Sequence, residues 1–286
     1  MRKVADMLTI IKSSSLYQKM RAYKYKLKRR NISSKKLSIA ETELILVKKL
    51  NITQGDTLLV HCGFGFLNAD YTPLELIELL IKLVGKGGNI IMPFYPPGLS
   101  KDWIKSGRVF DYSKTRCSTG ALAQEFSKFK GVHFSHHPIK PIIALGNDAL
   151  NLAKDHDYSE YPYDEKSPYY KLSKLSQAKA IGLGVRNCSL VHMIEDLYED
   201  DKSYLYSNEK IEGSVCLTDG KNLTISSYYH SGRFNLCEPK DFLDKYCTSI
   251  MNLKNINGTV FYSVNASSLL VEGKELFNKG VNRKCR

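Results

Sequence analysis

The chain has 286 residues, of which 43% are hydrophobic and 25% are charged, so it can bury one large core or two modest ones. No stretch reaches the roughly 18 to 20 uninterrupted apolar residues of a membrane-spanning helix, and the first apolar cluster, residues 7–11, is too short for a signal peptide. Seven scattered cysteines without Cys-x-x-Cys spacing argue against a disulfide framework and against a zinc site, and we expect a cytoplasmic protein with reduced thiols.

The formal net charge of +13 is concentrated at the start of the chain. Residues 1–36 contain twelve Lys or Arg and one acid, so they carry +11, whereas the remaining 250 residues carry +2. We therefore divide the chain into a basic extension, residues 1–37, and a body, residues 38–286. The extension has the pattern of short amphipathic helices, and it can be solvated, packed on the body or a partner, or in peripheral contact with an anionic membrane surface. It has no groove-reading motif, so we expect no nucleic acid partner.

The body opens with a β-α-β pattern. Ser38 and Glu41 have the spacing of a capping box at the start of a helix that ends before Asn51. Residues 57–60 are apolar and predict a buried strand, Thr72 and Pro73 begin a helix that runs to residue 84, and residues 89–93 predict a second buried strand. We expect the two strands to be parallel and joined by a right-handed crossover.

Two segments near these strands are candidates for binding. A glycine-bearing loop, Gly63-Phe64-Gly65, follows the first strand, where backbone N–H groups commonly meet an anionic or thioester ligand, although a tight turn explains the same residues. Residues 94–118 form a long polar loop that contains Trp103, Asp102 and Asp111, and loops of this length are usually functional or mobile.

The central stretch, residues 119–146, holds two adjacent imidazoles. Thr119 and Gly120 precede a helix that Gly131 ends, and residues 142–145 predict a short buried strand. Between them lie His136 and His137, on a turn before Pro138. Histidine is the side chain best suited to move protons near neutral pH, but a turn residue with a satisfied ring is the alternative.

Further along the chain, short helices are predicted over residues 147–153 and 170–175, with a turn-rich loop between them. A buried strand over residues 180–185 is followed by a helix beginning at Ser189, in which His192 and Glu195 lie three residues apart and therefore on one face. This pair lacks a third ligand for a metal. Residues 210–229 are β-rich, residues 239–251 predict a helix, and a strand at 258–260 and a helix over 267–277 close the pattern.

The body resembles the aminoglycoside 3-N-acetyltransferase family in a series of short motifs. These are Gly55-Asp56, Val60-His61, Gly87-Gly88, Met92-Pro93, Gly120-Ala121-Leu122, Ser135-His136-His137-Pro138, Ser167-Pro168 and the set Ser189, Val191, His192 and Glu195. The chain departs from the family where Gly63 replaces a serine, where residues 164–168 lack two glycines, and where Pro141 stands in place of a serine.

The resemblance implies a three-layer α/β/α sandwich with a mostly parallel central sheet and a β-rich C-terminal portion. It also implies transfer of an acyl group from acetyl-CoA, or another acyl-CoA, to an amine, without a metal. We expect His137 to be the base, with His192 and Glu195 in supporting catalytic roles and with Ser135 and Glu195 orienting the imidazoles. His136 can exchange roles with His137. The residues expected to contact CoA are His61, Gly63, Phe64, Gly65, Thr119, Gly120, Ser135 and His136, and those expected at the acceptor are Lys140, Glu165 and Asp111.

The sign of the charges bears on the acceptor. Aminoglycosides are polycations and favour an acid-lined site, whereas Lys140 and Lys166 lie on the two loops expected beside the cleft. We therefore expect a nucleotide-linked amino sugar used in surface-polysaccharide synthesis, ahead of an aminoglycoside in antibiotic resistance. A non-catalytic scaffold or binding protein of the same fold is the third hypothesis, and a homodimer stays open.

Overall fold

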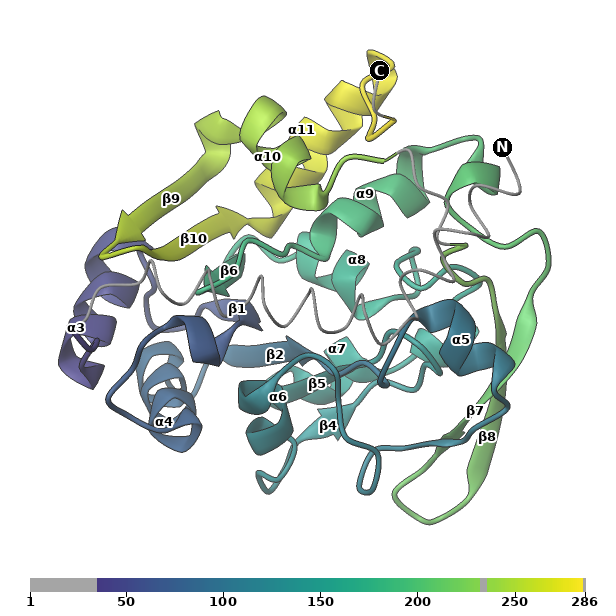
Figure 1. Ribbon diagram of the computed structural model, residues 1–286, viewed down its shortest axis with the longest axis horizontal. Coiled ribbons are helices and arrows are strands. Elements are labelled where there is room, and N and C mark those ends of the chain that lie inside the picture. The colour runs from purple at the N-terminus through teal and green to yellow at the C-terminus, as the bar shows by residue number, and fades with distance from the viewer. Residues whose placement is uncertain (1–34, 232–235, 285–286) are drawn as a thin grey trace, which may run out of the picture.

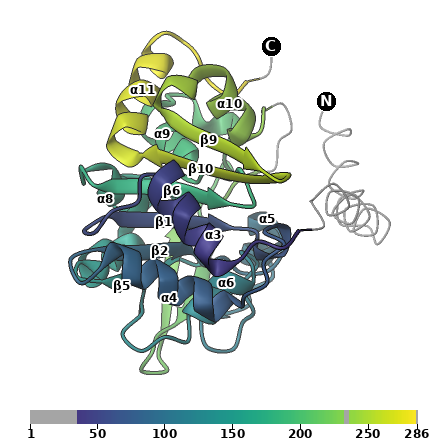
Figure 2. The same cartoon turned by 90° about the vertical axis from the view of Figure 1, so that its left-hand side faces the viewer.

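A computed structural model describes residues 35–231 and 236–284 of the chain (Figure 1). Its centre is a seven-stranded sheet with the strand order β4-β5-β2-β1-β6-β10-β9. The strands are β1 Thr57–Cys62, β2 Asn89–Pro93, β4 His133–Phe134, β5 Ile142–Gly146, β6 Ala178–Leu183, β9 Met251–Ile256 and β10 Thr259–Asn265. In Figure 2 they follow one another from β9 at the top to β5 at the bottom.

The three middle strands are parallel, since β1 pairs with β2 on one side and with β6 on the other. The outer strands β4, β5, β10 and β9 are attached by antiparallel pairing, so the sheet as a whole is mixed. The expected parallel β1-α4-β2 unit is confirmed, as is the α/β class. The β-rich C-terminal portion is also confirmed, but its last hairpin, β9–β10, joins the central sheet.

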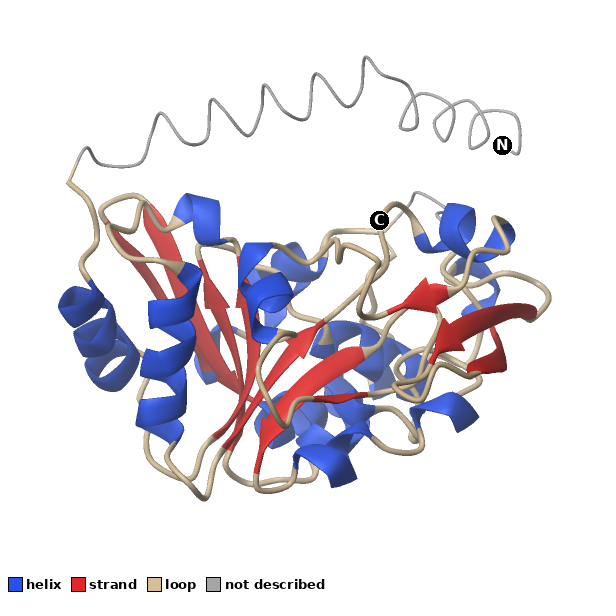
Figure 3. Ribbon diagram, turned by 90° about the horizontal axis from the view of Figure 1, so that it is seen from below, coloured by secondary structure: helices blue, strands red, loops and turns tan. Residues whose placement is uncertain are grey.

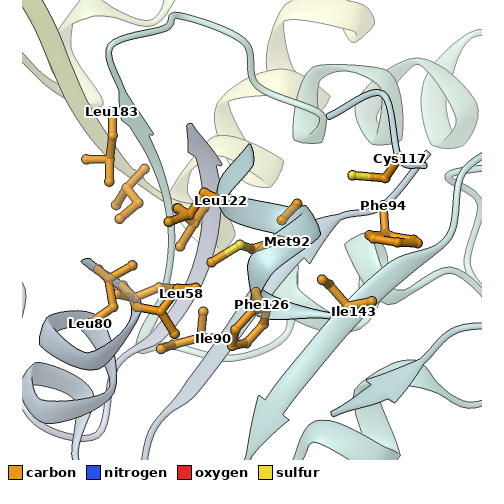
Figure 4. Close-up of a cluster of buried hydrophobic side chains, with 14 of the residues drawn as sticks. Leu58, Leu80, Ile90, Met92, Phe94, Cys117, Leu122, Phe126, Ile143 and Leu183 are labelled. Carbon is orange, nitrogen blue, oxygen red and sulfur yellow. The ribbon is translucent and has the colours of Figure 1, made fainter. Parts of the chain in front are cut away.

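Helices cover both faces of the sheet (Figure 3). One face carries α3 Ile39–Leu44, a π-helical turn Ile45–Lys49, α4 Pro73–Val84 and α6 Ala121–Phe126, which bury Leu58, Ile90 and Met92 together with Leu80 and Phe126 (Figure 4). The other face carries α7 Ala149–Ala153, α8 Pro168–Ser173, α9 Leu190–Tyr198, α10 Pro239–Tyr246 and α11 Ala266–Asn278. Within the described ranges no helix is both long and apolar enough to cross a membrane.

Local sequence signals account for the helix starts. The capping boxes of Ser38 with Glu41 and of Thr72 with Glu75 are both present, and Pro73 occupies the first turn of α4, as expected. Gly85 ends α4 with a positive φ of 64°, a conformation that favours glycine.

The segment expected to be a polar loop is more ordered than its sequence indicates. It contains α5 Ser100–Lys105 and the two-residue strand β3 Phe110–Asp111. β3 joins a second, three-stranded sheet with β7 Ile211–Cys216 and β8 Asn222–Ser227, away from β9 and β10 (Figure 1). Trp103 and Phe110 pack edge to face at a centroid distance of 5.7 Å and anchor the segment to the core, which is a tertiary contact that local composition does not reveal.

The helix predicted over residues 239–251 is shorter than expected. α10 ends at Tyr246, and β9 begins at Met251. β9 is an edge strand in which polar and apolar residues are interspersed and none is buried, so it lacks the apolar run that signals a buried strand. The basic extension lies outside the described residues except for residues 35–37, and the structure leaves its role a prediction.

The close contact at Gly182 gives the first prediction. A Cβ atom at this position on β6 would lie 2.0 Å from the buried Tyr262 ring and 2.5 Å from the carbonyl oxygen of Val185. We expect Gly182→Ala to lower the free energy of unfolding by about 1–3 kcal/mol, measured by urea titration, because the overpacked strand must move. Gly87→Ala is the matched control, since a Cβ atom added there would meet nothing within 4 Å, and equal stability of the two variants would contradict the packing argument.

Candidate active site

A cleft of about 720 Å³ opens at the carboxyl ends of the parallel strands β1, β2 and β6. β1 is the point at which the chain's direction across the sheet reverses, because α4 leads to β2 on one side while β6 lies on the other side. Such a switch point is where open α/β sheets leave room for a ligand. The lining comes from the strand ends, the loops before α6 and α9, Lys140, and residues 238–240 and 258–260.

His192, in the first turn of α9, lies in this cleft against a buried carboxylate. Its Nδ1 is 2.9 Å from Oε2 of Glu195, and Glu195 is only 1% exposed. Arg283 holds the same carboxylate with two hydrogen bonds, from Nε to Oε1 at 2.6 Å and from Nη2 to Oε2 at 2.9 Å. The expectation that His192 and Glu195 share a helix face is confirmed, while Arg283 was not predicted.

The electrostatics of this group favour a neutral imidazole beside a charged carboxylate. Burial lowers the pKa of His192 and outweighs the opposing effect of the hydrogen bond to Glu195. Burial alone would raise the pKa of Glu195, but the His192 hydrogen bond and the charge of Arg283 bring it below its ordinary value. With Glu195 ionised, neutral His192 donates its Nδ1 proton to the carboxylate, which leaves the Nε2 lone pair free to accept a proton.

Aromatic and histidine side chains surround His192. The Tyr163 and His230 rings lie 5.3 Å and 5.1 Å from it, centroid to centroid. His61, at the end of β1, accepts a hydrogen bond at Nε2 from the backbone N–H of Ser189 at 3.2 Å, and burial lowers the pKa of His61 to about 3. His61 is therefore a neutral residue that fixes the start of α9 at the cleft wall.

Lys140 reaches the same cleft, as expected from the sequence. Its Nζ lies 4.3 Å from the centroid of the Tyr95 ring, and Tyr95 in turn bonds Tyr163 and Ser189 through its hydroxyl group. Burial lowers the pKa of Lys140 to about 8, and among the described residues no carboxylate forms an ion pair with it. Lys140 is thus a cation that a ligand can neutralise.

The loop before α6 also reaches the cleft. Thr119 is fixed by a hydrogen bond from its Oγ1 to the carbonyl oxygen of Pro93 at 2.6 Å, and Gly120 has a φ of 114° that strongly favours glycine. Because α6 begins at Ala121, its first N–H groups have no intrahelical acceptors and lie at the cleft wall. Gly63 also lines the cleft, but its own N–H donates to the carbonyl oxygen of Leu183. Phe64 and Gly65 do not line it, since this short 3₁₀ turn packs Phe64 against Tyr71.

His137, the residue expected to be the base, does not lie at the cleft. Its ring is 0% exposed, and its Nδ1 accepts hydrogen bonds from the N–H groups of Ile139 and Lys140, both at 3.2 Å. The remaining nitrogen, Nε2, lies 3.3 Å from the hydroxyl of Ser227 and carries the proton. With its lone pair occupied and no access to solvent, His137 stabilises the turn, which was the alternative interpretation of a histidine before proline.

The neighbours of His137 are displaced from the cleft in the same way. Ser135 is buried, accepts a hydrogen bond from the N–H of Ile142 at 2.8 Å and bonds Nδ1 of His156 at 2.8 Å, and it does not line the cleft. His136 lines a separate hollow of about 350 Å³, together with Tyr112 and Asp157. The assignment of Ser135 and His136 to CoA is therefore corrected.

The two acids expected at the acceptor are also absent from the cleft lining. Asp111 lies on β3, accepts hydrogen bonds from Ser113 and pairs with Lys114. Glu165 is exposed in the turn before α8. Sequence reasoning also missed Tyr95, Tyr163, His230, Arg186 and Arg283, which come from distant segments and belong to no local motif.

The fold and cleft together define an α/β protein with an open cleft at its strand ends, beside an imidazole that is hydrogen-bonded to a buried carboxylate. Residues 59–278 match the family model of the aminoglycoside 3-N-acetyltransferases, and the chain belongs to this family. Aminoglycoside N(3)-acetyltransferase IV from Salmonella sp. is 28% identical over 148 residues, which are 51% of this chain and about half, 54%, of that relative.

Solved structures share the fold. The match to a structure of AAC-IIIb in a binary complex with CoASH has a TM-score of 0.72 at 20% sequence identity. It covers 87% of this chain and 98% of that chain. Aminoglycoside acetyltransferase AAC(3)-Xa has a TM-score of 0.73 at 18% identity, with coverages of 92% and 99%. The YokD protein from Bacillus subtilis has a TM-score of 0.62 at 17% identity, with coverages of 84% and 94%.

A structural role for His137 predicts how stability responds to pH. Burial holds the pKa of His137 well below its ordinary value near 6.5, so the unfolded chain binds a proton there that the folded chain does not. The stability contributed by this group is complete above about pH 6.5 and is lost as the pH falls, with a slope of at most about 1.4 kcal/mol per pH unit. Chemical denaturation between pH 5 and 7.5 should show a shallower slope for His137→Gln, together with lower stability at pH 7.5. His133→Gln, half-exposed on β4, is the control, and an unchanged slope in His137→Gln would contradict this role.

Proposed function

We propose that the chain is an acetyl-CoA-dependent N-acetyltransferase that acts on an amino group of an aminoglycoside. The single observation that carries this proposal is His192, which lines the cleft and is held by the buried Glu195, in a member of the aminoglycoside 3-N-acetyltransferase family. Polysaccharide synthesis, expected first from the sequence, has no support from the comparisons, which favour the aminoglycoside alternative. We assign the activity to residues 38–286.

The chemistry requires a base. An amine is mostly protonated near neutral pH, and an ammonium group is not a nucleophile, so a proton must leave as the nitrogen attacks. Nε2 of His192 accepts that proton, and Glu195 stabilises the imidazolium through the Nδ1 hydrogen bond. The backbone N–H groups at the start of α6 are the candidates to stabilise the carbonyl oxygen as it becomes negative.

The cleft fits acetyl-CoA, which supplies the acyl group as a thioester. Two cationic side chains, Arg186 and Lys240, line it and favour an anionic ligand. Arg186 lines the cleft and pairs with Asp244, and its buried Nε has no hydrogen-bond partner among the described residues. A phosphate oxygen is an acceptor that would satisfy this N–H group, so Arg186 and Lys240 are the residues we assign to the phosphates.

Removal of the base should abolish most turnover. We expect His192→Gln to lower kcat by roughly 10²–10⁴-fold and Glu195→Gln by a smaller factor, measured by thiol release from acetyl-CoA with an aminoglycoside acceptor. Because burial lowers the pKa of His192, kcat/KM of the wild type should hold below pH 6.5 and fall only at more acid pH. His136→Gln is the matched control, since it lies in the separate hollow, and a loss of turnover there equal to that of His192→Gln would overturn the assignment.

Lys140 supports a second candidate, an acceptor that carries an anionic group. Arg186 and Lys240 pair with Asp244 and Asp241, whereas Lys140 has no such partner among the described residues. It also lies close enough to His192 to lower the pKa of that imidazole. An amine attached to a phosphate- or carboxylate-bearing sugar would neutralise Lys140, whereas a polycation would be repelled.

An acceptor panel separates the two candidates. Wild-type enzyme and Lys140→Met are assayed by thiol release with gentamicin-class drugs and with UDP- and dTDP-linked amino sugars. For an aminoglycoside enzyme, Lys140→Met should lower KM for the drug, because a repulsive charge is lost. For the second candidate, Lys140→Met should lower kcat/KM for the nucleotide-linked sugars by roughly 10–100-fold, because one charge-assisted hydrogen bond is lost. No thiol release with any amine, together with no CoA binding by calorimetry, would favour the scaffold hypothesis.

A further inference from the structure

We propose that Arg283, which follows α11, is a positioning residue of the active site. This inference rests on the proposed function, because it assigns to Arg283 the task of holding Glu195 against the proposed base.

The guanidinium group of Arg283 binds the carboxylate of Glu195 through two hydrogen bonds. Its Nε and Nη2 each donate to a different oxygen of Glu195, at 2.6 Å and 2.9 Å, and its side chain is 6% exposed. The planar guanidinium group fixes both the position and the rotation of the carboxylate. His192 bonds the same Oε2 atom at 2.9 Å, so the direction of the imidazole depends on the angle that Arg283 sets.

The same residue also holds the rim of the cleft. Nη1 of Arg283 donates to the carbonyl oxygen of Cys237 at 2.8 Å, and the N–H of Cys237 donates to the carbonyl oxygen of Arg283 at 2.9 Å. A β-bridge joins Leu236 to Lys284. Because Glu238 and Pro239 line the cleft directly after this contact, one segment fixes the base and part of the ligand wall together.

The family match does not include this residue. It ends at residue 278, five residues before Arg283, so the cation on Glu195 comes from a segment outside the matched region. Glu195 itself lies within the match. The ion pair therefore joins Glu195, which lies inside the matched region, to Arg283, which lies outside it.

The charge of Arg283 has a directional effect on the base. The titratable and charged groups near the His192–Glu195 pair are Arg283, Lys140, His61, His230, Tyr163, Asp196, Tyr204 and Tyr206. Arg283 lowers the pKa of both members of the pair. Without this charge, the pair holds its shared proton more tightly and becomes a competent base only at higher pH.

Three variants test this proposal. Arg283→Gln removes both the charge and the two-pronged hydrogen bonding, and Arg283→Lys keeps the charge without the two-pronged geometry. Asn282→Ala alters the same segment through the hydrogen bonds of Asn282 to Glu199 and to the backbone N–H of Lys284, neither of which involves Glu195. Two properties are measured: the titration of the His192 ring by NMR of histidine-labelled protein, assigned with His192→Gln, and the pH profile of kcat/KM. The NMR titration needs no turnover, so a failure of the proposed function shows as an inactive wild type and leaves this test intact.

We expect the His192 titration of Arg283→Gln to move up by at least about 0.5 pH unit, and its kcat/KM to fall roughly 10–100-fold near pH 6.5 with partial recovery at pH 8.5. Arg283→Lys should keep the wild-type titration with a lower kcat, and Asn282→Ala should match the wild type in both. If Arg283→Gln does not fold, Arg283→Lys carries the test through its kcat. An unchanged titration and profile in folded Arg283→Gln, an unchanged kcat in Arg283→Lys, or an equal titration shift in Asn282→Ala would each overturn the proposal.

Discussion

The cleft depends on one buried carboxylate. Glu195 lies inside the layer of helices that includes α9 and α11, and it is ionised there because Arg283 and His192 both donate to it. A buried charge with only one partner would be strongly destabilising, so the three residues form a unit in which each member fixes the others. Among the described residues, Nε2 of His192 has no hydrogen-bond partner, whereas Nδ1 is held by Glu195. The buried ion pair therefore fixes the direction of the imidazole.

The sheet determines where this unit meets a ligand. β1 lies between two parallel neighbours, and the helices that follow β1 and precede β6 lie on opposite faces, so the strand ends leave an open space between α6 and α9. His61 at the end of β1 holds the backbone of Ser189, and Thr119 holds the end of β2 through the carbonyl oxygen of Pro93. These two contacts bring both helix starts to the same cleft. The positions of these helix starts thus depend on contacts to the backbone, while the imidazole of His192 comes from the first turn of α9.

Local sequence patterns predicted the frame of this protein well and the site only in part. The β1-α4-β2 unit follows from apolar runs separated by capping residues, and these signals are short-range. The spacing of His192 and Glu195 predicted their shared helix face for the same reason. Position 137 was misassigned because a motif identifies a residue type, whereas the role depends on which nitrogen is occupied, and the N–H groups of Ile139 and Lys140 occupy it. The contact of Arg283 with Glu195 could not be predicted for a different reason. The two residues are 88 positions apart in the sequence, and no local pattern links them.

The cationic side chains that line the cleft differ in whether they have acidic partners. Arg186 and Lys240 have acidic partners, so they offer hydrogen-bond donors to an anionic ligand with little excess charge. Lys140 has no acidic partner among the described residues, and its cation rests on the face of the Tyr95 ring, close to His192. Its ammonium group and the charge of Arg283 both act against protonation of His192. Burial has the largest effect on the pKa of His192, and these two charges add to it. For the proposed transfer, an amine therefore meets a neutral imidazole with two cations nearby, and loss of its proton to that imidazole removes the repulsion between the amine and those cations.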